Sequence, residues 1–218
     1  MSAPSLPKLK PKRSHPWSMH PLMSGGRSRT PSPSRRNKTA LIVIDMQVGV
    51  VKTCVDVQDV MTHIGSLVQR ARQAGAPVIW VQHEDEVLVR DTMEWALAPG
   101  LPPPLDEEVR VHKRFRDSFT APELEHELHS RGVHHVVIVG AQSDYCVRTT
   151  AQSAAVRGYA VTVPRDAHTT EDAEFRGTKI PAQQIVQHTN VYFNDFEYQP
   201  GVWCRNVASD EVEFAQRP

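Results

Sequence analysis

The stretch TALIVIDMQ, residues 39–47, decides how the rest of the chain is interpreted. Its apolar residues run almost without interruption up to Asp45, a pattern typical of a strand that is buried on both faces of a sheet. Three later runs have the same character: PVIWVQ at 77–82, HHVVIVG at 134–140 and YAVTVP at 159–164. Such runs are usual in parallel sheets, so we expect these four strands to belong to one sheet.

Segments with helical signals lie between these strands. Asp56 can cap a helix whose apolar residues recur at helical spacing and which ends at Gly75. Thr120 and Glu123 form a capping-box signature for a second helix, which ends near Gly132. Each helix is therefore placed between two strands of the predicted sheet.

The alternation continues through residue 193. A segment of small and apolar residues after residue 140 predicts a tightly packed helix that ends at Gly158. A helix over 180–188 and a strand-like TNVYF at 189–193 complete the order. Repeated strand and helix predict an α/β fold, in which helices cover both faces of a mostly parallel sheet.

The charge of the chain is divided between two parts. The whole sequence has 25 basic and 25 acidic residues, but no Asp or Glu precedes Asp45. Residues 1–38 hold nine Lys or Arg, seven Pro and eight Ser, a composition that buries too little apolar surface to fold. We therefore expect a disordered basic tail over 1–38 and one globular domain over 39–218, long enough for a full core.

Three interpretations of the basic tail remain open. An organelle-targeting peptide is one, although seven prolines oppose the amphipathic helix that import requires. A nucleic-acid arm is another, but no aromatic interleaving or groove-reading module accompanies the cations. We favour a solvated extension and expect no nucleic-acid partner.

Several classes of protein are not indicated by the sequence. No run of 18 apolar residues exists, and the tail has no apolar segment of the kind that a secretory signal needs. Cys54, Cys146 and Cys204 are sparse and lack CxxC spacing, so neither a disulfide framework nor a thiolate zinc site is expected. We expect a cytoplasmic protein with free thiols and no membrane partner.

Polar residues follow three of the predicted strands. Asp45 ends the first strand, Lys113 ends the segment VRVHK, and Cys146 lies in the first turn of the helix after the third. Ligands bind at the carboxyl ends of such strands, so these side chains are expected to converge. A helix N-terminus and an ammonium favour a thiolate, while a carboxylate can take the thiol proton.

Each of these residues also has a structural explanation. Cys146 can be a small packing residue, Asp45 a turn or cap residue, and Lys113 part of the solvated basic segment HKRFR. Their shared position at strand ends favours the catalytic interpretation.

Four segments of the sequence together resemble a known superfamily. They are LIVIDMQ (41–47), HKRFRDSF (112–119), VGAQSDYCVRTTAQSAAVRGY (139–159) and DAHTT (166–170). In this order they resemble the isochorismatase-like cysteine hydrolases, which include nicotinamidases, N-carbamoylsarcosine amidases and streptothricin hydrolases. The resemblance implies a three-layer α/β/α fold with a mostly parallel six-stranded sheet, assembled as homo-dimers or homo-tetramers.

The resemblance also implies a catalytic apparatus. Asp45, Lys113 and Cys146 occupy the positions of the superfamily's catalytic triad, and a cis peptide is implied between Ala141 and Gln142. The N–H groups of Gln142 and Cys146 would then form the oxyanion hole. The implied reaction is hydrolysis of an amide, carbamoyl or lactam C–N bond of a small molecule through a thioester, with no cofactor.

The sequence departs from the superfamily's patterns at two places. Nicotinamidases have a DxH metal motif after the second strand, where this chain has His83, Glu84 and Asp85, so we expect no metal. Asp117 stands where the family often has Ser, a change that we expect to affect substrate contacts. We also expect a substrate pocket, with core packing as the competing role for its members, lined by Gln47, Trp80, His83, Trp95, Phe119 and Tyr145.

Two other functions remain alternatives. Some members of the superfamily cleave a vinyl ether by acid catalysis, for which Asp45 would be the acid and the thiol would be dispensable. The presence of Cys146 favours the thiol route. A non-catalytic binding module of the same fold is the second alternative, and the complete triad argues against it.

Overall fold

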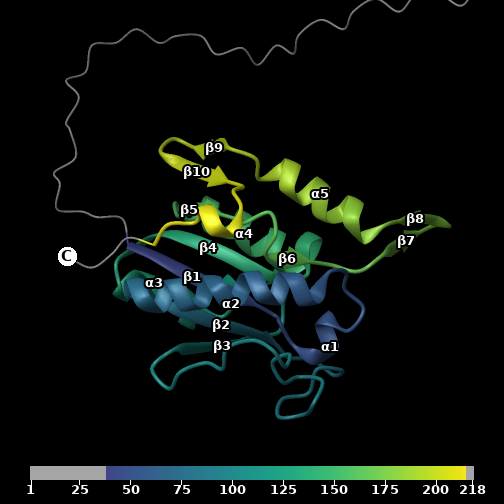
Figure 1. The fold of residues 1–218 in the computed structure, drawn as a ribbon. Helices are drawn as coiled ribbons and strands as arrows, with labels where there is room; N and C mark the ends of the chain where they lie inside the picture. The colour runs from purple at the N-terminus through teal and green to yellow at the C-terminus, as the bar shows by residue number, and fades with distance from the viewer. Residues whose placement is uncertain (1–37, 215–218) are drawn as a thin grey trace, which may run out of the picture. The chain divides into compact units, whose positions relative to one another are not determined.

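The run that opens the domain forms β1 (Lys38–Ile44), whose last six residues are all buried. The structure is a computed structural model that describes residues 38–214 (Figure 1). The disorder predicted for the basic tail concerns residues that lie, apart from Lys38, outside this described part, and it stays a prediction.

β1 lies inside a sheet with the order β3-β2-β1-β4-β5-β10-β9. The first six of these strands are mutually parallel, β9 adds an antiparallel edge, and the short β6 pairs with β4. The predicted mostly parallel sheet of six strands is confirmed, with β9 and β6 as additions. The strands are β2 (Val78–His83), β3 (Val109–Lys113), β4 (Val133–Ala141), β5 (Ala160–Thr162), β6 (His168–Thr169), β9 (Phe196–Gln199) and β10 (Val202–Arg205).

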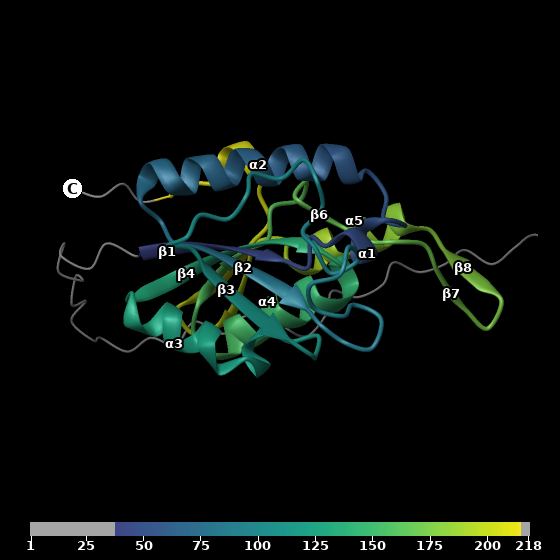
Figure 2. The same cartoon turned by 90° about the horizontal axis from the view of Figure 1, so that it is seen from below.

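Helices cover both faces of the sheet, as expected for a three-layer fold. α2 (Val57–Ala74) lies on one face, and α3 (Pro122–Ser130) and α4 (Arg148–Val156) lie on the other (Figure 2). The two faces have separate apolar cores because side chains alternate along β1: Ile42 packs on the α3–α4 side and Leu41 on the α2 side. The remaining elements are α1 (Val48–Val51), the hairpin β7 (Ala173–Phe175) and β8 (Thr178–Ile180), and α5 (Ala182–Tyr192).

Several local predictions can be compared with the structure. α2 begins after Asp56 and ends at Gly75, as predicted, although the Asp56 side chain makes no capping hydrogen bond. The capping box at Thr120 is wrong. Ala121 precedes α3, while the Thr120 hydroxyl donates to the carbonyl of Asp117 in a short turn.

The strand predicted over 189–193 is also wrong, because α5 continues through Tyr192. The residues have high strand propensity, but Phe193 is fully buried in the core while Val191 is exposed, a helical pattern of burial. The sixth parallel strand is instead β10, which the sequence reasoning missed. Among the residues described, no helix is both long and apolar enough to cross a bilayer.

The fold brings the ends of β1, β3 and β4 to one edge of the sheet. β1 and β4 approach so closely there that a Cβ on Gly140 would lie 2.0 Å from the carbonyl oxygen of Ile44. Gly140 also has φ of +120°, which is strained for any other residue. A glycine is therefore required beside the residue that precedes Asp45.

Candidate active site

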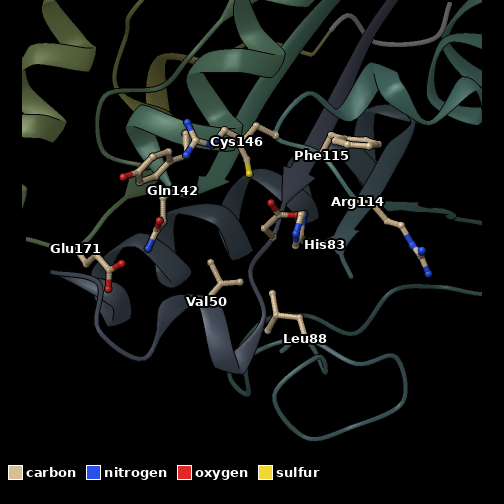
Figure 3. A pocket seen from close by; sticks show the side chains of 11 residues that line it. Val50, His83, Leu88, Arg114, Phe115, Gln142, Cys146 and Glu171 are labelled. Atoms are coloured by element: carbon tan, nitrogen blue, oxygen red, sulfur yellow. The ribbon is translucent and has the colours of Figure 1, made fainter. Parts of the chain in front are cut away.

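Asp45, Lys113 and Cys146 meet at this edge of the sheet. Asp45 and Cys146 form the floor of a cavity (Figure 3), and Lys113 is buried against both of them. The Lys113 Nζ lies 2.7 Å from Asp45 Oδ2 and 3.3 Å from Cys146 Sγ. The side chains of Lys113 and Asp45 are 0% and 2% exposed, so they form a buried ion pair. The structure thus brings together the three residues that the sequence placed at strand ends.

Different local structures present the three side chains. Asp45 follows β1 with φ of +49°, a left-handed conformation that Asp tolerates better than most residues, and its N–H donates to the carbonyl of Val81. Lys113 is the last residue of β3. Cys146 lies in a π-helical turn, Ser143–Val147, that leads into α4.

The electrostatics of Cys146 differ from the sequence-based expectation of a stabilised thiolate. Burial, and then the charge of Asp45, raise the pKa of the Cys146 thiol to about 12, and Lys113 offsets only part of this. The resting thiol is therefore neutral, because Lys113 is already paired with Asp45 and the site keeps no net positive charge.

The two carboxylate oxygens of Asp45 have different surroundings. Its Oδ1 is buried and has no hydrogen-bond partner among the described residues, whereas Oδ2 is held by Lys113. An unpaired carboxylate oxygen beside a neutral thiol can act as a general base at the moment when sulfur attacks.

The segment before Cys146 has a special backbone. The peptide bond between Ala141 and Gln142 is cis, which is the bond implied by the resemblance. The carbonyl of Gln142 accepts hydrogen bonds from the N–H groups of Tyr145 and Val147, at 3.1 and 3.2 Å, and so belongs to the turn. The oxyanion hole formed by the N–H groups of Gln142 and Cys146 stays a prediction.

The cavity above the triad has a volume of about 560 Å³. In Figure 3, Gln142 and Glu171 lie on one side of it and Arg114 on the other, while Val50 and Leu88 face the region of Cys146. The wall thus combines apolar side chains with charges of both signs. The full lining comprises Asp45, Val50, His83, Leu88, Arg114, Phe115, Arg116, Gln142, Tyr145, Cys146 and Glu171.

Two of the predicted wall residues, His83 and Tyr145, line this cavity. The His83 Nδ1 lies 3.3 Å from the Lys113 ammonium, and its Nε2 lies 3.3 Å from Asp85 Oδ2. Because an ammonium only donates, Nδ1 accepts and Nε2 carries the proton toward Asp85. The guanidinium of Arg116 lies over the ring of Tyr145, with its Cζ 4.2 Å from the ring centroid.

The structure places the other four predicted wall residues outside the lining of this cavity. Trp80 is fully buried beneath α2 and donates from Nε1 to Glu108, and Phe119 packs in the opposite core. Trp95 stacks on His112 away from the lining. All three are aromatic residues that pack against the protein instead of a ligand.

Gln47 is the fourth of these residues, and it supports the site from below. It is fully buried, and its side chain bonds both the N–H and the carbonyl of His83 and the carbonyl of Trp95. These bonds tie the end of β2 to the loop over 84–98. Gln47 therefore fixes the position of His83 without contacting the cavity.

Sequence reasoning missed six residues of the lining. Arg114, Phe115 and Arg116 follow Lys113 directly, in a segment that supports the family resemblance and whose charges are typical of a solvated face. Glu171 directly follows the segment DAHTT, and its position next to a segment that carries the family resemblance could have indicated that it lies near the site. Val50 and Leu88 carried no readable signal.

The residues that depart from the superfamily's patterns have local partners. Glu84 pairs with Arg90 and Arg114, and Asp85 with His83. Within residues 38–214, no three His, Cys, Asp or Glu side chains gather as a metal ion would need. The expected absence of a metal stays a prediction.

Asp117 makes no contact with the cavity, so its expected effect on substrate contacts is not supported. Its carboxylate accepts from the N–H of Phe119 and, at 2.6 Å, from the hydroxyl of Ser153. It joins the turn after β3 to α4 and is a structural residue.

Three comparisons relate the chain to known proteins. The family model described as the isochorismatase domain matches residues 39–187. A streptothricin hydrolase from Streptomyces noursei is 35% identical over 171 residues, which cover 76% of this chain and 67% of that relative. A secreted isochorismatase effector from Verticillium dahliae is 30% identical over 164 residues, 72% of this chain and 84% of that relative. An isochorismatase structure from Pseudomonas putida superposes with a TM-score of 0.72 at 26% identity, over 80% of this chain and 90% of that one.

Proposed function

Because the chain belongs to the isochorismatase family, we propose that it is a hydrolase that cleaves a C–N bond of a small amide, carbamoyl or lactam compound through Cys146. The observation that carries the proposal is the buried contact network of Asp45, Lys113 and Cys146 at the floor of the cavity. Its similarity to a streptothricin hydrolase supports an amide substrate.

The proposed reaction has two halves. In the first, Asp45 takes the proton of the Cys146 thiol while the sulfur attacks the substrate carbonyl carbon, and the C–N bond then breaks as Asp45 returns that proton to the leaving nitrogen. In the second, Asp45 deprotonates a water molecule that attacks the thioester. The carbon–sulfur bond breaks, the acid leaves, and the thiol recovers its proton.

Lys113 has a supporting role in this scheme. Its ammonium touches both Asp45 and Cys146, so it compensates the negative charge as that charge moves from carboxylate to sulfur. The N–H groups of Gln142 and Cys146 would stabilise the oxyanion.

The cavity supports a small and polar substrate. Its volume of about 560 Å³ falls within the range that small-molecule sites occupy. Arg114, Arg116 and Glu171 supply charges of both signs at the wall, and Leu88 and Phe115 supply apolar contacts. No organic cofactor is required by this chemistry.

A second candidate is cleavage of a vinyl ether with Asp45 as the acid. The isochorismatase domain match and the Verticillium relative favour it. The two reactions make different demands on sulfur, because the ether route needs no nucleophile.

An ammonia-release screen across primary amides and N-carbamoyl compounds tests the proposal. We expect turnover of at least one compound by the wild type and none by Cys146→Ala. Cys204→Ala is the matched control, because Cys204 is a fully buried residue of β10, the strand between β5 and β9, and does not line the cavity. Full activity of folded Cys146→Ala would contradict the thiol mechanism and favour the ether route or another chemistry.

The assembly and the location of the protein also remain proposals. We propose a homo-dimer or homo-tetramer in the cytoplasm, and multi-angle light scattering of the purified full chain tests the first. A monomer at micromolar concentration would contradict it.

A further inference from the structure

The segment DAHTT contains a buried histidine that the proposed mechanism does not use. His168 is the first residue of β6, which pairs with the last two residues of β4 at Gly140 and Ala141. It therefore lies directly beside the cis peptide and the turn that carries Cys146. The residue is 2% exposed.

His168 bonds the first residue of this turn. Its Nδ1 lies 2.8 Å from the hydroxyl of Ser143, which is itself fully buried. On the other side of the ring, Nε2 lies 2.9 Å from Oδ1 of Asn190 in α5. The ring thus joins the π-helical turn to α5.

The directions of these hydrogen bonds follow from the neighbouring amides. Asn190 donates from Nδ2 to the carbonyl of Arg165, so its Oδ1 is the acceptor that faces His168. Asn206 donates to the same Oδ1 at 2.9 Å and to the carbonyl of Val163 at 2.7 Å. Nε2 of His168 must therefore carry the proton.

The tautomer fixes the role of Ser143. With the proton on Nε2, a neutral ring offers only an acceptor at Nδ1, so the Ser143 hydroxyl donates to it. Burial lowers the pKa of His168 and keeps the ring neutral. The Ser143 hydroxyl thus donates to His168, which donates to Asn190 Oδ1, and the same oxygen also accepts from Asn206.

A second bond from the same segment reaches the same turn. The hydroxyl of Thr170 donates to Asp144 Oδ1 at 2.7 Å. Two consecutive residues of the turn, Ser143 and Asp144, are thus held from the segment 168–170. The backbone of the segment 168–170 is itself held, because the N–H of Val55 donates to the carbonyl of Thr170.

From this arrangement we propose that His168 is a positioning residue for the nucleophile, acting through Ser143 on the turn that carries Cys146. The effect of His168 on catalysis rests on the proposed function, whereas its effect on the conformation of the turn does not. A buried hydroxyl that loses its acceptor is unpaired, so the turn would relax and Cys146 would move.

The test compares His168→Leu, His168→Gln and Ser143→Ala in the full chain. The leucine variant removes both ring hydrogen bonds, the glutamine variant can still donate to Asn190 and accept from Ser143, and Ser143→Ala removes only the contact with the turn. His135→Leu is the matched control. His135 also bridges two elements through its ring nitrogens, to Thr39 and Thr162, but at the opposite end of the sheet.

The primary measurement is the rate at which iodoacetamide labels Cys146, followed by peptide mass spectrometry. It needs no substrate, so it remains valid if the proposed function fails. Relaxation of the turn exposes the sulfur, and we expect labelling to become roughly threefold faster or more in His168→Leu and Ser143→Ala. We expect His168→Gln to lie close to the wild type, and His135→Leu to lower thermal stability without changing the labelling rate.

Turnover of an amide found in the screen gives the second measurement. A displacement of about 1 Å at a reacting group costs on the order of 10²-fold in rate, so kcat should fall by roughly 10- to 100-fold with a smaller change in KM. If His168→Leu does not fold, Ser143→Ala alone decides the question. Labelling within twofold of the wild type in folded Ser143→Ala would overturn the inference, whether or not Cys146→Ala is inactive.

Discussion

The floor and the rim of the cavity are built on different principles. The floor consists of Asp45 and Cys146, which line the cavity, and of Lys113, which is buried against both, and these residues lie at strand ends and in one tight turn. The rim is Leu88, Arg114, Phe115, Arg116 and Glu171, which lie on loops, and Phe115 is 67% exposed. Strand ends hold groups at fixed distances, whereas loops can vary without disturbing the core. The difference suggests that chemistry is fixed at the floor and substrate choice at the rim.

The largest effect is expected from breaking the ion pair of the floor. Lys113→Met leaves the Asp45 carboxylate buried without its partner, and loss of one partner of a buried pair costs about 3–5 kcal/mol. We expect a loss of that size in urea unfolding, together with loss of turnover. The double variant with Asp45→Asn should recover part of the stability but no activity. Additive losses in the double variant would show that the two groups do not interact.

The next largest effect concerns the dependence of Cys146 on pH. Burial and the charge of Asp45 raise its pKa to about 12, so the thiol is protonated at neutral pH. The fraction of thiolate therefore rises as the pH is raised toward the pKa. Labelling of Cys146 by iodoacetamide should therefore increase roughly tenfold per pH unit between pH 7 and 9. A plateau below pH 8 would indicate a resting thiolate and contradict the role of Asp45 as the proton acceptor.

A smaller effect on the floor is expected from its backbone support. Gly140→Ala places a methyl group against the carbonyl of Ile44 and forces a left-handed conformation on alanine. We expect a destabilisation of more than ~1 kcal/mol and a reduced kcat, because the strand end that carries Asp45 must shift. Gly158→Ala is the control, since its φ is also positive but no atom lies within 4 Å of the added carbon. Equal activity per folded molecule in both variants would contradict the link to Asp45.

The smallest effect is expected at the rim. Arg116→Ala removes the cation–π contact with Tyr145 and one cationic group of the wall. Such a contact is worth about 0.5–1 kcal/mol, so KM should change by a factor of ~2–5 with little change in kcat. Arg148→Ala, which removes a similar contact with Tyr192 away from the cavity, should leave KM unchanged. A large loss of kcat in Arg116→Ala would place this residue in the chemistry and erase the distinction between floor and rim.

The same distinction explains what the sequence could predict. Asp45 directly follows β1 and Lys113 is the last residue of β3. The carboxyl ends of parallel strands lie together in the sheet independently of the loop sequences. The sheet and the floor followed from that rule and from the family resemblance. The rim did not, because Leu88 and Glu171 lie outside the strands and helices and carry no periodic signal.

The misplaced aromatic residues have a related cause. Trp80 lies in a strand whose two faces both pack against a core. The alternation of side chains along the strand does not show which of the two cores Trp80 enters, and neither core contains a ligand cavity. The same limit applies to residues 189–193, where strand propensity was overruled by the packing of α5. The local sequence pattern predicts that a residue is buried more reliably than it predicts which residues it packs against.

The left-handed backbone at Asp45 narrows the routes by which this position can change. Besides glycine, asparagine and aspartate adopt that conformation most readily. Most substitutions at this site would therefore strain the backbone between β1 and α1, in addition to removing the carboxylate. A descendant that gives up catalysis while keeping the architecture would be expected to carry asparagine or glycine here. The turn geometry therefore limits which residues can replace Asp45, and asparagine or glycine at this position in a homologue would indicate loss of the carboxylate chemistry with the turn retained.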